Sequence, residues 1–133
     1  MQRKINSGLI PLILLLISFV YSCANRGPGP TGGPKDETPP RVIRSLPENG
    51  ALNFKTKEIM VEFDENISLE KLSENVIISP PQKKNPDIRS YNKRLVIKFE
   101  DDLRESTTYT LNFGNAIVDL NEKNPLPDYL FSF

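Results

Sequence analysis

Short stretches in which apolar and polar residues alternate recur through residues 41–133. The clearest is 107–113, where polar residues separate Tyr109, Leu111 and Phe113. Side chains along a β-strand point alternately to opposite faces, so a period of two predicts a strand with one buried face. The other segments with this alternation, or with strand-forming residues, are 41–46, 58–63, 76–79, 87–91, 94–99, 117–120 and 129–133.

Turn residues separate these segments. Asn92 and Lys93 predict a two-residue turn that joins 87–91 to 94–99 as a hairpin. Residues 68–72 predict one short helical turn with Ser68 as its N-cap. About seven short strands without a long amphipathic helix predict an all-β fold, an antiparallel two-sheet sandwich with Greek-key connections.

Leu103 and Tyr109 add a structural expectation. The leucine lies six residues before the tyrosine, and small polar residues stand just ahead of the tyrosine. This arrangement resembles the tyrosine corner of Greek-key sandwiches, in which the phenol hydroxyl bonds back to the chain and fixes a loop between the sheets. Alternatively, Tyr109 is a core aromatic residue of an alternating strand. Either interpretation gives Tyr109 a structural role.

The N-terminal region has a different pattern. After Arg3 and Lys4, an apolar run of about 12 residues extends over 9–20, which is short of the roughly 20 residues that span a bilayer and matches a signal peptide. Val20 and Ser22 stand three and one residues before Cys23, the only cysteine in the chain. This spacing resembles a bacterial lipoprotein signal.

Two cleavage sites remain open for this signal. An ordinary signal peptidase would cut near Ser22, whereas lipoprotein signal peptidase would cut immediately before a lipidated Cys23; the spacing favours the second. Residues 1–22 are then a signal peptide, and the mature chain is attached to the membrane through lipid on Cys23. Ala24 is not the aspartate that resembles an inner-membrane retention signal, so we expect an outer-membrane location in the cell envelope.

Residues 23–40 are predicted to be a linker. Nine of the 17 residues in 24–40 are glycine or proline, and none is a large apolar residue. Such a segment buries too little surface to offset its ordering entropy, so it is predicted to be an extended tether. A polyproline ligand for a partner groove is the alternative, but no P-x-x-P pair flanked by basic residues supports it. The folded domain is then expected over 41–133.

Charge and residue types restrict the chemistry. The chain has 17 basic and 17 acidic residues and no histidine. This balance gives no electrostatic case for nucleic-acid binding, which requires a basic face. Without histidine or a second cysteine, Ser-His-Asp catalysis, Cys-His catalysis and a zinc set are all excluded. The adjacent pairs Asp64/Glu65 and Asp101/Asp102 are interpreted as solvated turn charges. We therefore predict neither an enzyme nor a cofactor site.

Two kinds of ligand site are alternatives to this interpretation. Asp64, Glu65, Asp119 and Asn121 offer oxygen atoms from two loops, and calcium takes six to eight oxygen ligands. No D-x-D-x-D-G spacing supports such a metal site. Glycan binding would require an aromatic platform, for which only Tyr91 or Tyr129 is available, with Tyr129 expected to face the core.

Four stretches together resemble a bacterial Ig-like domain of the SbsA type. They are the P-P-R-V to P-E-N-G segment at 39–50, V-E-F-D-E-N-I at 61–67, T-Y-T-L at 108–111 and D-L-N-E-K-N-P-L at 119–126. Asn66 replaces a proline of the family pattern, and Glu122-Lys123 stands where a glycine is usual. The resemblance covers about 41–133 and implies an Ig-like sandwich.

The segment 32–40 is also similar to the start of outer-membrane lipoproteins in which further β-domains follow this one. By that similarity the chain is expected to be a fragment that continues beyond Phe133. The function expected is that of a non-catalytic, lipid-anchored envelope module, a spacer or adhesion and interaction domain. The alternatives are a domain with a loop site for a glycan or an envelope protein, and an accessory N-terminal domain of a larger envelope protein.

Overall fold

The computed structural model describes residue 29 and residues 32–133. The predicted signal peptide and the predicted lipidation site at Cys23 lie outside the described residues. The chain divides into a unit ending at Pro34 and a second unit, Lys35–Phe133. Only the second contains the strands described below.

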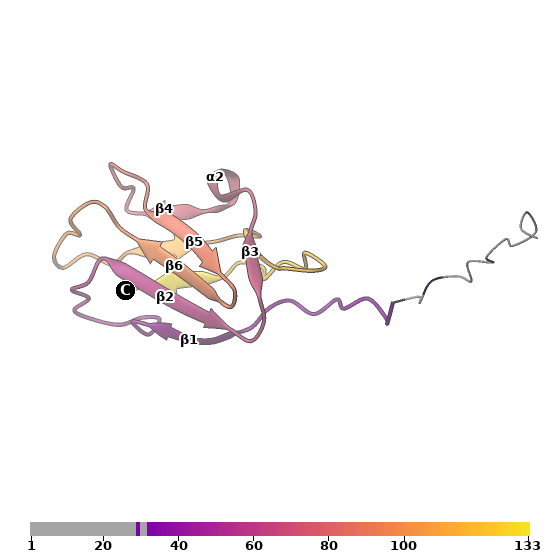
Figure 1. Ribbon diagram of the computed structural model, residues 1–133. Helices are drawn as coiled ribbons and strands as arrows, with labels where there is room; N and C mark the ends of the chain where they lie inside the picture. The colour runs from indigo at the N-terminus through magenta and orange to yellow at the C-terminus, as the bar shows by residue number, and fades with distance from the viewer. Residues whose placement is uncertain (1–28, 30–31) are drawn as a thin grey trace, which may run out of the picture. The chain divides into compact units, whose positions relative to one another are not determined.

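Nine strands and one short helix make up the second unit (Figure 1). The strands are β1 (Val42–Leu46), β2 (Glu58–Phe63), β3 (Ile67–Leu69), β4 (Ile77–Ser79), β5 (Asp87–Tyr91), β6 (Arg94–Lys98), β7 (Thr110–Asn112), β8 (Ile117–Asp119) and β9 (Leu130–Ser132). The helix, α2, spans Leu72–Asn75.

The strands form antiparallel sheets around one core. One sheet has the order β1-β2-β6-β5, a second has β4-β7-β9, and β3 pairs with β8. The prediction of an all-β antiparallel sandwich is confirmed. Among the residues described, no helix has the length and hydropathy needed to cross a bilayer.

Alternation along the strands explains the core. In β2 the residues at every second position are buried, and β6 follows the same rule. Side chains from the inner faces of all the sheets meet in one cluster, as expected when the apolar faces of opposing sheets pack together. The cluster consists of Ile59, Val61, Phe63, Ile67, Leu95, Ile97, Phe99, Leu111, Phe113, Ile117 and Phe131.

The hairpin prediction is also confirmed. β5 and β6 pair in register from Asp87 opposite Lys98 to Tyr91 opposite Arg94. The two residues between the strands are those predicted, and Asn92 has a φ of 52°. Asparagine tolerates this left-handed conformation better than most residues, which suits it to a two-residue turn.

The predicted helical turn at 68–72 is wrong in position and in cap. Ile67–Leu69 is a strand, and Ser68 pairs with Val118 of β8. The helix begins later, after Lys71 in a left-handed conformation, and its N-terminus has no side-chain cap. The local leucine spacing favoured a helix, but burial of Ile67 and pairing along β8 outweigh so weak a local preference.

The strand predicted over 107–113 is regular only at Thr110–Asn112. Its ladder continues beyond these limits, however. The amide of Tyr109 donates to the carbonyl of Phe133 at 2.8 Å, and that of Phe113 donates to the carbonyl of Tyr129 at 3.0 Å. Tyr109, Leu111 and Phe113 are all buried, as the alternation predicts.

The turn after β1 covers the free edge of β9. Asn49 donates from Nδ2 to the Leu130 carbonyl at 3.0 Å and accepts at Oδ1 from the Ser132 amide at 2.8 Å. Gly50, with a φ of 81°, donates its amide to the Ser132 carbonyl at 2.7 Å. The Asn-Gly pair therefore forms hydrogen bonds with backbone groups of β9 that could otherwise pair with another chain.

The chain just before β1 lies against the domain. Asn124 donates from Nδ2 to the carbonyl of Asp36 at 2.9 Å, and Pro40 is buried. The Arg41 amide donates to Oδ1 of Asp64 at 2.8 Å. Residues 36–40, which the sequence assigns to the linker, are thus held by Asn124, and the next residue, Arg41, is held by Asp64.

Candidate functional site

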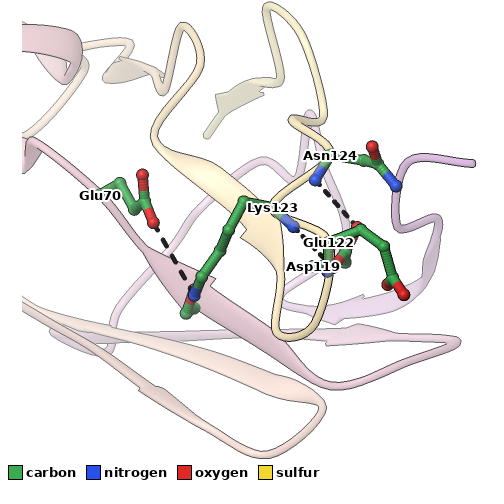
Figure 2. A network of polar contacts seen from close by, with 6 residues as sticks. Glu70, Asp119, Glu122, Lys123 and Asn124 are labelled. Atoms are coloured by element: carbon green, nitrogen blue, oxygen red, sulfur yellow. Dashed lines mark hydrogen bonds and ion pairs between the residues drawn. The ribbon is translucent and has the colours of Figure 1, made fainter. Parts of the chain in front are cut away.

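The loop that follows β8 is organised around the carboxylate of Asp119 (Figure 2). Its side chain is only 1% exposed. Oδ1 accepts the backbone amides of Glu122 at 2.7 Å and Lys123 at 3.0 Å, and Oδ2 accepts that of Asn124 at 2.9 Å. One carboxylate therefore accepts hydrogen bonds from three consecutive backbone amides that are not paired within a strand.

These bonds also set the ionisation of Asp119. Burial alone would raise the pKa of its carboxyl group, because the charged form loses hydration. The backbone hydrogen bonds from Asn124, Lys123 and Glu122 outweigh burial, and the net pKa lies below its ordinary value. Asp119 is consequently a charged, fully bonded group at neutral pH.

Lys123 connects this loop to β3. Its Nζ donates to Oγ of Ser68 at 2.8 Å and lies 3.7 Å from Oε1 of Glu70 (Figure 2). Lys123 has a φ of 66°, in the left-handed region that favours glycine. This backbone conformation explains why a glycine is usual at this point in the pattern that the loop resembles.

Glu65 lies in the field of several carboxylates near the Asp119 loop. Burial raises the pKa of Glu65, and the charges of Asp119 and Asp64 raise it further, with smaller contributions from Asp36 and Glu122. Asp64, Glu65 and Asp119, three of the residues considered for calcium, are thus near enough for their charges to interact. Sequence reasoning missed Asp36 because it was assigned to the linker, and Glu122 because it was considered only as a departure from a family pattern.

We expect Glu65→Gln to stabilise the domain slightly at pH 7. The raised pKa means that the ionised form of Glu65 is disfavoured in the folded state, so its charge costs stability above that pKa and costs none below about pH 4. After solvent screening the gain should be about 0.5 kcal/mol or less. Urea unfolding at pH 7 and pH 3.5 measures it, with Glu105→Gln as the matched control. An equal gain at both pH values would contradict the electrostatic explanation.

The calcium alternative finds little support in this geometry. Both oxygens of Asp119 already accept backbone amides, and Oδ1 of Asp64 accepts the Arg41 amide. Within residue 29 and residues 32–133, no group of three or more acidic, histidine or cysteine side chains is arranged to hold a metal ion. The chemistry that the site displays is the fixing of a loop.

Tyr109 and Leu103 lie next to a different loop. Oη of Tyr109 accepts the backbone amide of Arg104 at 2.8 Å, five residues upstream. The tyrosine is 2% exposed, and its ring stacks on Phe133 with centroids 5.3 Å apart. Leu103 is partly buried against the core cluster. The phenol therefore holds the loop before β7, while its ring fills the core.

The two tyrosines considered as a glycan platform are in different surroundings. Tyr129 packs against Phe63 and Phe113, with ring centroids 6.5 and 5.9 Å away, and burial raises its pKa to about 12. Tyr91 is 54% exposed and lies at the hairpin end of β5. They do not form one aromatic surface.

The remaining acidic pair is occupied by structural contacts. Asp101 accepts the Lys84 amide at 2.8 Å through Oδ2, and Asp102 pairs with Nζ of Lys57 at 2.6 Å. Both carboxylates tie neighbouring loops together.

A sandwich with these fixed loops agrees with the comparison to known families. The model of the bacterial Ig-like domain family matches residues 36–133. The chain belongs to this family. No curated protein and no solved structure matches the chain.

The bacterial Ig-like domain therefore includes both loops described above. The matched range begins at Asp36, the residue whose carbonyl accepts the Asn124 side chain. Domains of this family are generally non-catalytic and often occur outside the cell or in its envelope. In the described part of this domain, the contacts of Asp119 and Tyr109 each fix a loop.

Proposed function

We propose that this chain is a non-catalytic, lipid-anchored module of the cell envelope, in which the Ig-like domain serves as a spacer or interaction module. Family membership over 36–133 is the observation that carries the proposal. The domain supplies a rigid body, since its long loops are fixed by Asp119 and Tyr109. Its partner would be an envelope protein or a glycan, held at a set distance from the membrane.

The anchor is the part of the proposal that rests on sequence. Cys23 follows a short apolar run and precedes a segment rich in glycine and proline. One acyl chain gives only reversible membrane binding, whereas two or three chains hold a protein effectively permanently. Lipidation of Cys23 would therefore fix the domain at the envelope, and the absence of aspartate at residue 24 favours the outer membrane.

Replacing Cys23 by serine is expected to abolish incorporation of an alkyne fatty acid and to release the protein from the membrane fraction. The cause is loss of the thiol that accepts the lipid. Click labelling and fractionation of cells that express the full chain measure both effects. Ser22→Ala is the control, because it keeps a small residue before the cysteine and should remain labelled. A Cys23→Ser chain that stays labelled and membrane-bound would show that the anchor is elsewhere or absent.

A further inference from the structure

The two middle strands of the four-stranded sheet carry opposite charges on their outer face. Along β2 the outward residues are Glu58, Met60 and Glu62, and along β6 they include Arg94 and Lys98. Glu58 lies opposite Lys98, Met60 opposite Val96 and Glu62 opposite Arg94. On these two strands, two charged rows therefore flank the apolar pair Met60 and Val96.

The outer strands add both charged and apolar residues. On β5, Asp87 lies next to Lys98, Arg89 next to Val96 and Tyr91 next to Arg94. Arg44 of β1 lies next to Glu62, and Leu46 lies next to Met60. Leu46 and Tyr91 are 55% and 54% exposed, so this face is open in the described part of the chain. Arg44 is paired with Glu62.

Asp87 and Arg89 of β5 also pair with each other, at 2.8 Å, but three charges on the two middle strands have no such partner in the part of the chain that the structure describes. Among the described residues, Glu58, Arg94 and Lys98 take part in no ion pair, although Glu58 and Lys98 are neighbours across the two strands. They can therefore pair with groups on another molecule. The occupant must present basic groups over the two ends of β2, acidic groups over the two ends of β6, and an apolar side chain over the middle of each strand.

A second copy of this chain meets these conditions. Consider a two-fold axis that lies just outside this face, runs parallel to the strands and passes midway between β2 and β6. Rotation about it turns the outer face of a second copy toward the first and places its β6 over β2. Glu58 then faces Lys98 of the second copy, Glu62 faces Arg94, and Met60 faces Val96. Each contact occurs twice, as in any isologous interface.

We propose that the chain forms a homodimer through this face. The alternative two-fold axis, across the strands, would place Glu58 over Glu62 and Arg94 over Lys98. That arrangement brings like charges together, which is unfavourable at an interface. The charge pattern thus selects one of the two face-to-face dimers. Opposed sheets pack about 10 Å apart, a distance that these side chains span from both sides.

The dimer should be weak and sensitive to salt. The face uses one side of four short strands, which is smaller than the roughly 20–30 residues per partner of a stable interface. Ion pairs at its rim are screened as ionic strength rises. Dimerisation does not depend on the lipid anchor, so the two proposals can fail separately.

Charge reversal at one contact tests the proposal. We expect Glu58→Lys and Lys98→Glu each to weaken dimerisation of the full chain about tenfold or more, because each brings two pairs of like charges together. Sedimentation equilibrium in density-matched detergent measures the dissociation constant. Circular dichroism spectra should show that the variants keep the β-fold.

Two further measurements separate this dimer from other forms of association. An equimolar mixture of the two single variants should form a heterodimer, since both contacts between positions 58 and 98 then join a lysine to a glutamate. The double variant Glu58→Lys/Lys98→Glu should recover self-association. A wild-type chain that is monomeric at all concentrations would overturn the proposal. So would dimers that both single variants leave unchanged, or a folded double variant that fails to recover.

Discussion

Replacing Tyr109 by alanine is expected to lower the free energy of unfolding by about 3–5 kcal/mol, as for other large buried aromatic side chains. The ring is 2% exposed and lies against Phe99 and Phe133, with centroids 6.1 and 5.3 Å away. Alanine removes these contacts and leaves a cavity between the two sheets. Equilibrium unfolding in urea gives the change directly.

The phenylalanine variant separates the hydroxyl from the ring. Tyr109→Phe keeps the packing but removes the acceptor of the Arg104 amide, a bond of 2.8 Å. A loss of about 1 kcal/mol is expected, the usual net value of one hydrogen bond. Loss of protection from hydrogen exchange at the Arg104 amide should accompany it. If both variants lost equal stability, the hydroxyl rather than the ring would dominate, contrary to the packing argument.

Replacing Asp119 by alanine is expected to cost about 2–4 kcal/mol, because three backbone amides lose a charged acceptor in a buried position. The matched control is Asp64→Ala. That carboxylate is exposed and accepts one amide, from Arg41, so its loss should cost about 1 kcal/mol or less. Urea unfolding at pH 7 compares the two.

The stabilisation that Asp119 provides should decrease as the pH falls. Its pKa is lowered in the folded state, so the unfolded state binds the proton more readily and the stabilisation is present above the unfolded pKa of about 4. It is lost as pH falls through the folded pKa. The difference between wild type and Asp119→Asn should therefore be constant from pH 5 to 7 and shrink below pH 4. A difference independent of pH would exclude the charge as the cause.

The strands with the strongest alternation were predictable from sequence. In β2, β6 and the ladder through β7, every second side chain is apolar, and one buried face is the only arrangement that removes these side chains from water. The turn at Asn92 was predictable for a local reason too, since the two residues lie between two alternating runs. The region 67–72 was not predictable, because its strand depends on a partner, β8, that lies far away along the chain.

The candidate site was likewise predictable in part from the sequence. Asp119 was recognised as an oxygen donor, but its role was open between a metal ligand and a loop residue. Only the fold shows that its two oxygens face the amides of residues 122–124 and that the side chain is buried. The nearby Asp36 had no signal at all, because its proximity depends on contacts between distant segments.

The sequence alone determined the all-β class, the main buried faces and the resemblance to an Ig-like domain. These depend on periodicity and on short motifs, which are properties of neighbouring residues. The tertiary structure decided the pairing of β3 with β8, the ionisation of Asp119 and Glu65, and the opposed charges on the outer sheet face. Each depends on register and burial, and these are fixed only when segments far apart in the chain pack together.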